Sequence, residues 1–213
     1  MTLLPIFLRL TGRPCLVVGA GTVALAKIES LRGAGAAITV VAPEAVAQVQ
    51  ELAHQGLLRW HRRAFEPSDL EGVFLVIAAT NATEVNHTVY EEALRRNVIC
   101  NAVDDPPNCD FYFGSVVARG DLQVAISTAG ESPALAQRLR REIDAQLPDD
   151  LGPWLEELGG LRREVRAATA AGEARNLLLH ELAQRKVCGS VACPTRELAR
   201  ERIREMQRDE VVA

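Results

Sequence analysis

Short apolar runs alternate with longer amphipathic stretches along the first hundred residues of the chain. The apolar runs are rich in valine, isoleucine and leucine, which is typical of buried strands, and they cover residues 14–18, 37–41, 57–62, 73–78 and 98–102. The stretches between them have helical spacing and cover residues 22–33, 44–55 and 85–96. Strands that alternate with helices predict an α/β fold, in which a mostly parallel sheet is joined by crossover helices.

The pattern changes after residue 103. The run Asp104-Asp105-Pro106-Pro107-Asn108 suits neither a strand nor a helix, so it predicts a loop. Residues 111–118 and 122–126 predict a hairpin around the turn Arg119-Gly120-Asp121. Ser132-Pro133 combines a helix cap with a proline suited to the first helical position, and predicts a helix that ends near residue 147.

The stretch from Leu151 onward is rich in leucine, glutamate, arginine and alanine and has no strand pattern. It predicts a small helical domain with breaks at 159–160, at Gly172 and at 189–194. We therefore expect three parts: a parallel-sheet domain over 1–113, a small α+β segment over 114–148 and a helical domain over 149–213.

Composition excludes several classes of protein. The 213 residues are 48% hydrophobic and carry a net charge of −4, whereas a nucleic-acid-binding domain is usually strongly basic. No apolar run approaches the ~18 residues that a transmembrane helix needs, and the first ten residues do not have the pattern of a signal peptide. The expected location is the cytoplasm.

The cysteines and histidines do not predict a metal site. The five cysteines are odd in number and irregularly spaced, so we expect reduced thiols, with a pair between Cys188 and Cys193 as the alternative. The four histidines are scattered along the chain, at positions 54, 61, 87 and 180.

A glycine motif lies at the junction of the first strand and the first helix. Residues 19–24 read G-x-G-x-x-A, in which Gly19 allows a tight turn and Gly21 allows the backbone to approach a pyrophosphate. The motif predicts a Rossmann-like dinucleotide site that includes Ala20 and the free N–H groups of Thr22 and Val23. The alternative is a turn whose glycines only let helix and sheet pack closely.

Two further turns complete the expected cofactor site. The second strand is followed by Pro43 and Glu44, and Glu44 is the acid available to bind a ribose, with backbone groups as the alternative. No arginine follows that would favour a 2′-phosphate, so NAD is expected rather than NADP. Thr80 and Asn81 follow another apolar strand and are expected at the same sheet edge, although they could merely turn the chain.

Asp104 and Asp105 follow the last strand of the predicted sheet. A carboxylate at this edge can take a proton while a hydride leaves to a nicotinamide. Adjacent acids in a turn also serve local hydrogen bonding, so the residues alone leave both interpretations open.

Five stretches form a recognisable series, residues 16–24, 76–81, 101–104, 119–122 and 125–133, and the last contains an S-T-x-G-x-S-P motif. They occur in the order and spacing of the precorrin-2 dehydrogenase and sirohydrochlorin ferrochelatase family, and the chain resembles that family over about residues 1–150. Two departures are Asn81, where many members carry an acid, and Gly114, where many carry proline. The chain is similar to the stand-alone form, without a fused methyltransferase.

The resemblance implies NAD-dependent oxidation of precorrin-2 to sirohydrochlorin in siroheme biosynthesis, with iron insertion as a second activity that the sequence leaves open. It implies that Asp104 is the catalytic base, with Asp105 the weaker candidate. It also implies a homodimer built by residues 114–148. The implied substrate contacts are Arg119, Ser127, Thr128 and Arg138.

A different class of function stays open at this point. An NAD-binding regulatory module that senses redox state would share the glycine motif and would turn nothing over. Such a module has no reason to combine the N-x-x-D loop at 101–104 with the S-T-x-G-x-S-P motif.

Overall fold

The structure is a computed structural model that describes residues 3–190 and 192–212. The chain divides into two compact units. The first unit comprises Met1–Phe113 with Ala129–Glu131, and the second comprises Gly114–Thr128 with Ser132–Ala213. Each unit is described by itself.

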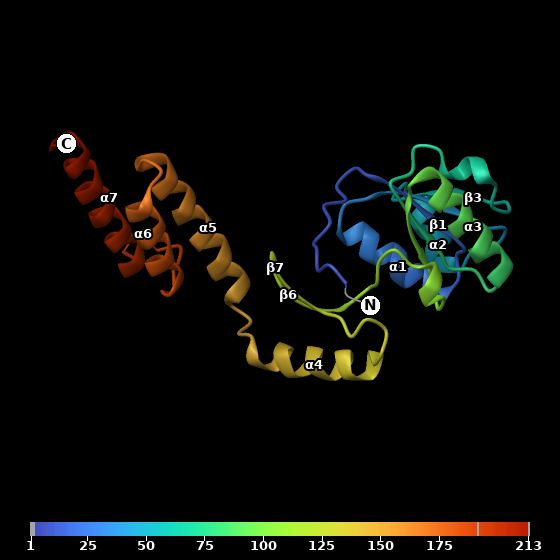
Figure 1. The fold of residues 1–213 in the computed structure, drawn as a ribbon. Helices are drawn as coiled ribbons and strands as arrows, with labels where there is room; N and C mark the ends of the chain where they lie inside the picture. The colour runs from blue at the N-terminus through green and yellow to red at the C-terminus, as the bar shows by residue number, and fades with distance from the viewer. Residues whose placement is uncertain (1–2, 191, 213) are drawn as a thin grey trace. The chain divides into compact units, whose positions relative to one another are not determined.

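The first unit is built on a five-stranded parallel sheet with helices around it (Figure 1). The strand order is β3-β2-β1-β4-β5. The strands are β1 (Pro14–Val18), β2 (Ala37–Val41), β3 (Arg59–His61), β4 (Leu75–Ala78) and β5 (Ile99–Ala102). The chain runs outward from β1 through β2 to β3 and then returns to pair β4 with the other side of β1. Strand order therefore reverses at β1, and in such sheets a ligand binds beside the carboxyl ends of the strands at this point. The predicted parallel α/β fold is confirmed.

Alternate residues of the strands supply two separate cores. Cys15 and Val17 face one core with residues of α1 (Thr22–Gly33) and α2 (Ala47–His54). Leu16 and Val18 face the other core with residues of α3 (Thr83–Arg96). Burial on both faces explains why these strands are continuous apolar runs rather than alternating ones. Each fully buried valine or leucine contributes about 1.5–3 kcal/mol.

Helix α2 begins three residues later than the expected start at Glu44. The backbone of Val46 is extended and its N–H donates to the Ala20 carbonyl at 3.0 Å, so residues 44–46 remain outside the helix. This hydrogen bond joins the loop after β2 to the glycine loop after β1. It also leaves the Glu44 side chain outside the packing of α2.

The described residues of the second unit form an antiparallel hairpin and four helices, which Figure 1 labels β6, β7 and α4 to α7. The hairpin pairs β6 (Ser115–Arg119) with β7 (Leu122–Ile126). The helices are α4 (Pro133–Gln146), α5 (Leu151–Ala168), α6 (Glu173–Ala183) and α7 (Pro194–Val212). Ser132 caps α4 as predicted, because its hydroxyl accepts a hydrogen bond from the N–H of Leu135 at 3.2 Å.

The predicted helix break at 159–160 is wrong. Gly159 and Gly160 lie inside α5, where each glycine costs about 1 kcal/mol relative to alanine. Leu161 and Val165 follow them and are buried in a core that α5 shares with α6 and α7. Their burial offsets the glycine cost. No described helix combines the length and the apolar character that crossing a bilayer requires.

Candidate functional site

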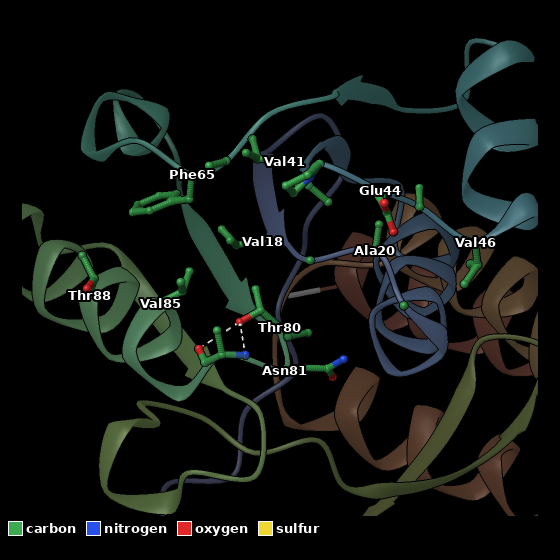
Figure 2. Close-up of a pocket in the computed structure, with 18 residues that line it drawn as sticks. Val18, Ala20, Val41, Glu44, Val46, Phe65, Thr80, Asn81, Val85 and Thr88 are labelled. Atoms are coloured by element: carbon green, nitrogen blue, oxygen red, sulfur yellow. Dashed lines mark hydrogen bonds between the residues drawn. The ribbon is translucent and has the colours of Figure 1, made fainter.

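A cavity of about 750 Å³ lies at the carboxyl ends of β1, β2 and β4 (Figure 2). Its size suits a ligand as large as a dinucleotide. Seven of the nine residues predicted for the cofactor line it: Gly19, Ala20, Gly21, Pro43, Glu44, Thr80 and Asn81. The apolar wall, which the sequence reasoning did not identify, includes Val18, Val41, Phe65 and Val85. Phe65 comes from the segment after β3, and no local motif marks it.

Gly19 is required by the packing of the sheet itself. Its φ of +102° is a conformation that residues with a side chain rarely adopt, and a Cβ there would lie 2.4 Å from the carbonyl oxygen of Ala79. Its N–H donates to the Val41 carbonyl at 2.9 Å. The glycine therefore lets the end of β1 contact the segments after β2 and β4 at once.

Gly21 is not required by the packing. Its φ is −81°, and a Cβ at this position would meet no described atom within 4 Å. Gly21 caps α1, whose first turn contains no acidic residue and receives no side-chain hydrogen bond at the cap. Thr22 and Val23 begin the helix, so their N–H groups are available to an anion. Gly21 keeps the approach to these donors open.

The loop after β2 is held by hydrogen bonds from β3 and the residue after it. The indole N–H of Trp60 donates to the Ala42 carbonyl at 3.0 Å, and Nε of Arg62 donates to the Pro43 carbonyl at 3.4 Å. Glu44 is the one charged side chain among the described residues that line the cavity. Its exposed carboxylate can accept hydrogen bonds from ribose hydroxyls and would repel a 2′-phosphate.

Asn86 fixes the turn that carries Thr80 and Asn81. Its side chain is buried, with 6% of the residue exposed. Oδ1 accepts from the Thr80 N–H at 3.1 Å and lies 2.7 Å from the Thr80 hydroxyl, while Nδ2 donates to the Thr80 carbonyl at 3.0 Å. Thr80 also bonds to Ala82 (Figure 2). The sequence reasoning missed Asn86, although a polar residue three positions before Val89 on the buried face of α3 was an available signal.

The two candidate bases, Asp104 and Asp105, lie in the loop after β5 and differ in their hydrogen bonding. Asp105 is engaged locally, because its carboxylate accepts from the Asn108 amide at 2.7 Å. Asp104 is exposed, has a φ of +60°, and makes no hydrogen bond or ion pair with a described residue. Asn101 joins the start of this loop to its end, because its buried side-chain amide donates a hydrogen bond to the Phe111 carbonyl at 2.8 Å. The N-x-x-D motif thus combines a buried anchor with an exposed carboxylate.

Asp104 belongs to the same sheet edge as the cavity. Ala78 pairs with Ala102 in the register of β4 and β5, and the Val103 N–H donates to the Ala78 carbonyl at 2.9 Å. Asp104 and Thr80 therefore follow neighbouring strands at equivalent positions, two residues beyond the last pair.

Lys27 on α1 is a further charged residue near this loop, and the sequence reasoning missed it. Its ammonium lies 3.9 Å from the centre of the Phe113 ring. Burial lowers the pKa of Lys27, and electrostatic interactions with Asp104 and Cys109 act in the opposite direction. No motif marks this lysine, because α1 and residue 113 meet only in the folded chain.

The residues expected to contact a substrate belong to the second unit. Arg119 is largely committed within it, with 17% of its side chain exposed: its guanidinium donates to the Asp144 carboxylate at 2.9 Å and to the carbonyls of Asp144 and Leu147. Arg138 is mostly exposed and pairs with Glu142 one turn away on α4. Thr128 accepts a hydrogen bond from the Ser132 N–H at 3.2 Å. Ser127 follows β7 and is exposed. Their contact with a substrate stays a prediction.

The described residues form neither a disulfide nor a cluster suited to a metal ion. All five cysteines are free, including Cys188 and Cys193. No group of three or more histidine, cysteine, aspartate or glutamate side chains comes together as a metal site in the part of the chain that the structure describes.

Comparison with known proteins agrees with this site. A family profile described as putative NAD(P)-binding matches residues 6–115, and one described as sirohaem biosynthesis protein central matches residues 119–146. A solved structure named SirC, precorrin-2 dehydrogenase, is 28% identical and superimposes with a TM-score of 0.77 over 95% of this chain and all of its own.

Curated relatives are similar over the same region. Siroheme synthase 1 of Cronobacter sakazakii is 48% identical over 162 residues, which are 76% of this chain and 34% of that protein. Siroheme synthase of Photorhabdus laumondii is 43% identical over 166 residues, which are 78% of this chain and 35% of that protein. The chain spans about a third of the length of these relatives. Because the first of these profiles covers more than half of the chain, the chain belongs to the family described as putative NAD(P)-binding, and its central segment matches the sirohaem-biosynthesis profile.

Proposed function

We propose that this protein is an NAD-dependent dehydrogenase that oxidises precorrin-2 to sirohydrochlorin in siroheme biosynthesis. One observation carries the proposal: the glycine-lined cavity and the exposed carboxylate of Asp104 belong to the same edge of one sheet. A cofactor site and a proton acceptor at one edge are what removal of a hydride and a proton requires. The names of the relatives, siroheme synthase and precorrin-2 dehydrogenase, supply the substrate class.

The residues present fit NAD. Gly21 and the open start of α1 suit a pyrophosphate, and Glu44 suits a ribose that carries both hydroxyls. When bound, the nicotinamide of NAD supplies the hydride acceptor. The apolar wall of the cavity excludes water from the cofactor, and the Thr80–Asn81 turn is held rigid against it by Asn86.

We propose Asp104 as the group that takes the proton. Its carboxylate is exposed and free of protein hydrogen bonds among the described residues, whereas Asp105 is held by Asn108. The left-handed backbone of Asp104 is one that aspartate adopts more readily than most residues, so the proposal rests on the exposed carboxylate and not on the backbone.

The test is anaerobic turnover of precorrin-2 with NAD, followed by sirohydrochlorin absorbance. Asp104→Asn keeps the side-chain shape and should lower kcat by about 10²–10⁴-fold. Asp105→Asn is the matched control and should retain most of the activity. Equal loss in both variants would remove Asp104 as the specific base. A wild-type protein that binds NAD but turns nothing over would favour the redox-sensing module.

We propose Ser127, Thr128 and Arg138 as substrate contacts, with Arg119 as a weaker candidate. Arg138 is mostly exposed, and its one ion pair with a described residue is with Glu142 of the same helix, which supports its availability to a carboxylate. Arg119 is already committed to the end of α4. Arg138→Ala should raise the KM for precorrin-2, and an unchanged KM would remove Arg138 from the set.

Iron insertion is a second candidate activity. The relatives named siroheme synthase support it, since siroheme is the iron complex of sirohydrochlorin, and iron would enter as substrate. The pyrrole protons that leave would need an acceptor, and Asp104 suits that task as well. Adding ferrous iron to sirohydrochlorin with wild type and with Asp104→Asn tests this by the absorbance of the product. A rate equal to the protein-free rate would exclude it.

We also propose that the protein is a homodimer. The hairpin of β6 and β7 is a two-stranded sheet, so both of its strands are edge strands that can accept strands from a second copy. Val116 on β6 is exposed, which supports the same view. Light scattering during gel filtration should give twice the mass of the chain, and a monomer at micromolar concentration would contradict the dimer. The five free thiols support a reducing location, the cytoplasm.

A further inference from the structure

The chain has only two lysines, Lys27 and Lys186, among its 24 basic residues. Lys186 is exposed and forms an ion pair with Asp150. Lys27 is half-buried on α1 and forms no ion pair or hydrogen bond with any residue that the structure describes. The two lysines therefore differ in how the protein balances their charge.

The surroundings of Lys27 are aromatic on one side. The Phe113 ring lies 3.9 Å from Nζ, and Phe113 packs against Phe111 at 5.4 Å between ring centres. The face of an aromatic ring attracts the ammonium group electrostatically. The ring does not replace the oxygen acceptors that the three N–H donors of a lysine ordinarily have. The donors that do not face the ring remain available.

The acidic groups near Lys27 do not balance its charge fully. Burial raises the pKa of the Cys109 thiol, so Asp104 is the negatively charged one of the two neighbours. Both neighbours favour the charged form of Lys27, yet burial still lowers its pKa. Asp104 is also not within ion-pair distance, since Lys27 forms no ion pair with a described acid. A half-buried ammonium with free donors beside the proposed base is a site that an anionic ligand would complete.

We propose that the Lys27 ammonium binds a carboxylate of the tetrapyrrole substrate and so holds the reacting ring beside Asp104. The inference rests on the proposed function, because it takes the substrate to be a tetrapyrrole with peripheral carboxylates. It gives Lys27 the role of a substrate-binding residue. Phe113 is 38% exposed and offers an apolar surface next to the Lys27 ammonium. An apolar surface beside a cation is complementary to a tetrapyrrole, which has an apolar ring and a negatively charged periphery.

The first experiment measures the pKa of Lys27 directly. Reductive methylation with ¹³C-formaldehyde labels two lysines and the N-terminal amine, and Lys27→Met assigns the Lys27 signal in the NMR spectrum. The signals are titrated with and without sirohydrochlorin, in the absence of NAD. A bound carboxylate should raise the pKa of Lys27, because a nearby negative charge favours the charged form. The pKa of Lys186 should not change.

Absorbance of sirohydrochlorin in the same samples reports binding independently. If sirohydrochlorin binds and the Lys27 signal is unchanged, the inference is wrong and Lys27 only packs against Phe113, while the proposed function stands. If sirohydrochlorin does not bind the wild-type protein at any concentration tested, the proposed substrate is wrong and the inference falls with it.

Substitutions give a second readout. Lys27→Met keeps a side chain of similar length against Phe113 and should raise the sirohydrochlorin dissociation constant by about 10–100-fold, the loss expected for a charge-assisted hydrogen bond. The NAD dissociation constant should not change. Lys27→Arg should recover part of the loss, and Lys186→Met should match the wild type. A change of kcat without a change of KM in Lys27→Met would contradict a binding role.

Discussion

The buried carboxamide of Asn86 is bonded to both the N–H and the carbonyl of Thr80, at 3.1 and 3.0 Å. A residue inside α3 thereby fixes the backbone of the turn that lines the cavity after β4. Because the two backbone groups point toward one side chain, the turn cannot rotate without losing both hydrogen bonds. Asn86 therefore positions Thr80 and Asn81 without lining the cavity itself.

Asn86→Ala should lower the free energy of unfolding by about 2–3 kcal/mol, since it leaves buried backbone groups of Thr80 without partners. It should also weaken NAD binding, because the turn loses its fixed conformation. Denaturant unfolding and calorimetric NAD titration measure the two effects. Asn81→Ala is the control for stability, and its unfolding midpoint should stay close to that of the wild type. Full NAD affinity in Asn86→Ala would show that the turn holds its shape unaided.

The two motif glycines should respond differently to alanine. Gly19→Ala introduces a Cβ 2.4 Å from the Ala79 carbonyl at a positive φ and should cost about 3 kcal/mol or more of stability. Gly21→Ala meets open space and should change stability by no more than about 1 kcal/mol. Its methyl group should nevertheless lower NAD affinity by about tenfold. Equal stability losses in the two variants would contradict this division of roles.

Glu44 should set the choice between NAD and NADP. Glu44→Gln removes the charge that repels a 2′-phosphate and weakens the hydrogen bond to the ribose, so the preference for NAD should narrow by about 10–100-fold. Dissociation constants for both cofactors measure the ratio. Glu51→Gln, an exposed change on α2, is the matched control. A ratio in Glu44→Gln equal to that of the wild type would mean that backbone groups alone select the cofactor.

Cys193 should ionise at a lower pH than Cys15 and Cys100, although all three thiols are buried. Burial opposes its charge, but hydrogen bonds from Cys188, Arg196 and Thr195 at the start of α7 lower its pKa to about 7. By contrast, burial raises the pKa of Cys15 to about 11 and that of Cys100 to about 12. A pH titration of thiolate absorbance should show a step near pH 7 that Cys193→Ser removes and Cys15→Ser retains.

The lowered pKa of Cys193 should also make the stability of the folded protein depend on pH. Because the pKa of Cys193 in the folded protein lies below the ordinary value of 9.0, folding favours the thiolate. The resulting stabilisation is complete above about pH 9 and declines as the pH falls through about 7. Stability that rises as the pH falls over this range, in wild type relative to Cys193→Ser, would contradict the thiolate assignment.

Sequence patterns predicted the elements of the first unit closely, because strands buried on both faces must be apolar throughout and helices must keep their 3.6-residue period. The glycine motif also predicted the turn between β1 and α1, and that turn lines the cavity. The predicted start of a helix at Glu44 was wrong, because the contact of Val46 with Ala20 joins segments 26 positions apart.

The sequence by itself thus determined the parallel sheet, the glycine loop and an acidic loop after the last strand, because each depends on residues that are neighbours along the chain. Only the tertiary structure decided that packing requires Gly19 but not Gly21, that Asn86 holds Thr80, and that Lys27 lies against Phe113 near Asp104. These roles depend on atoms brought together from distant strands and helices. The burial of these side chains, and the electrostatic interactions between them, arise only when the chain has folded.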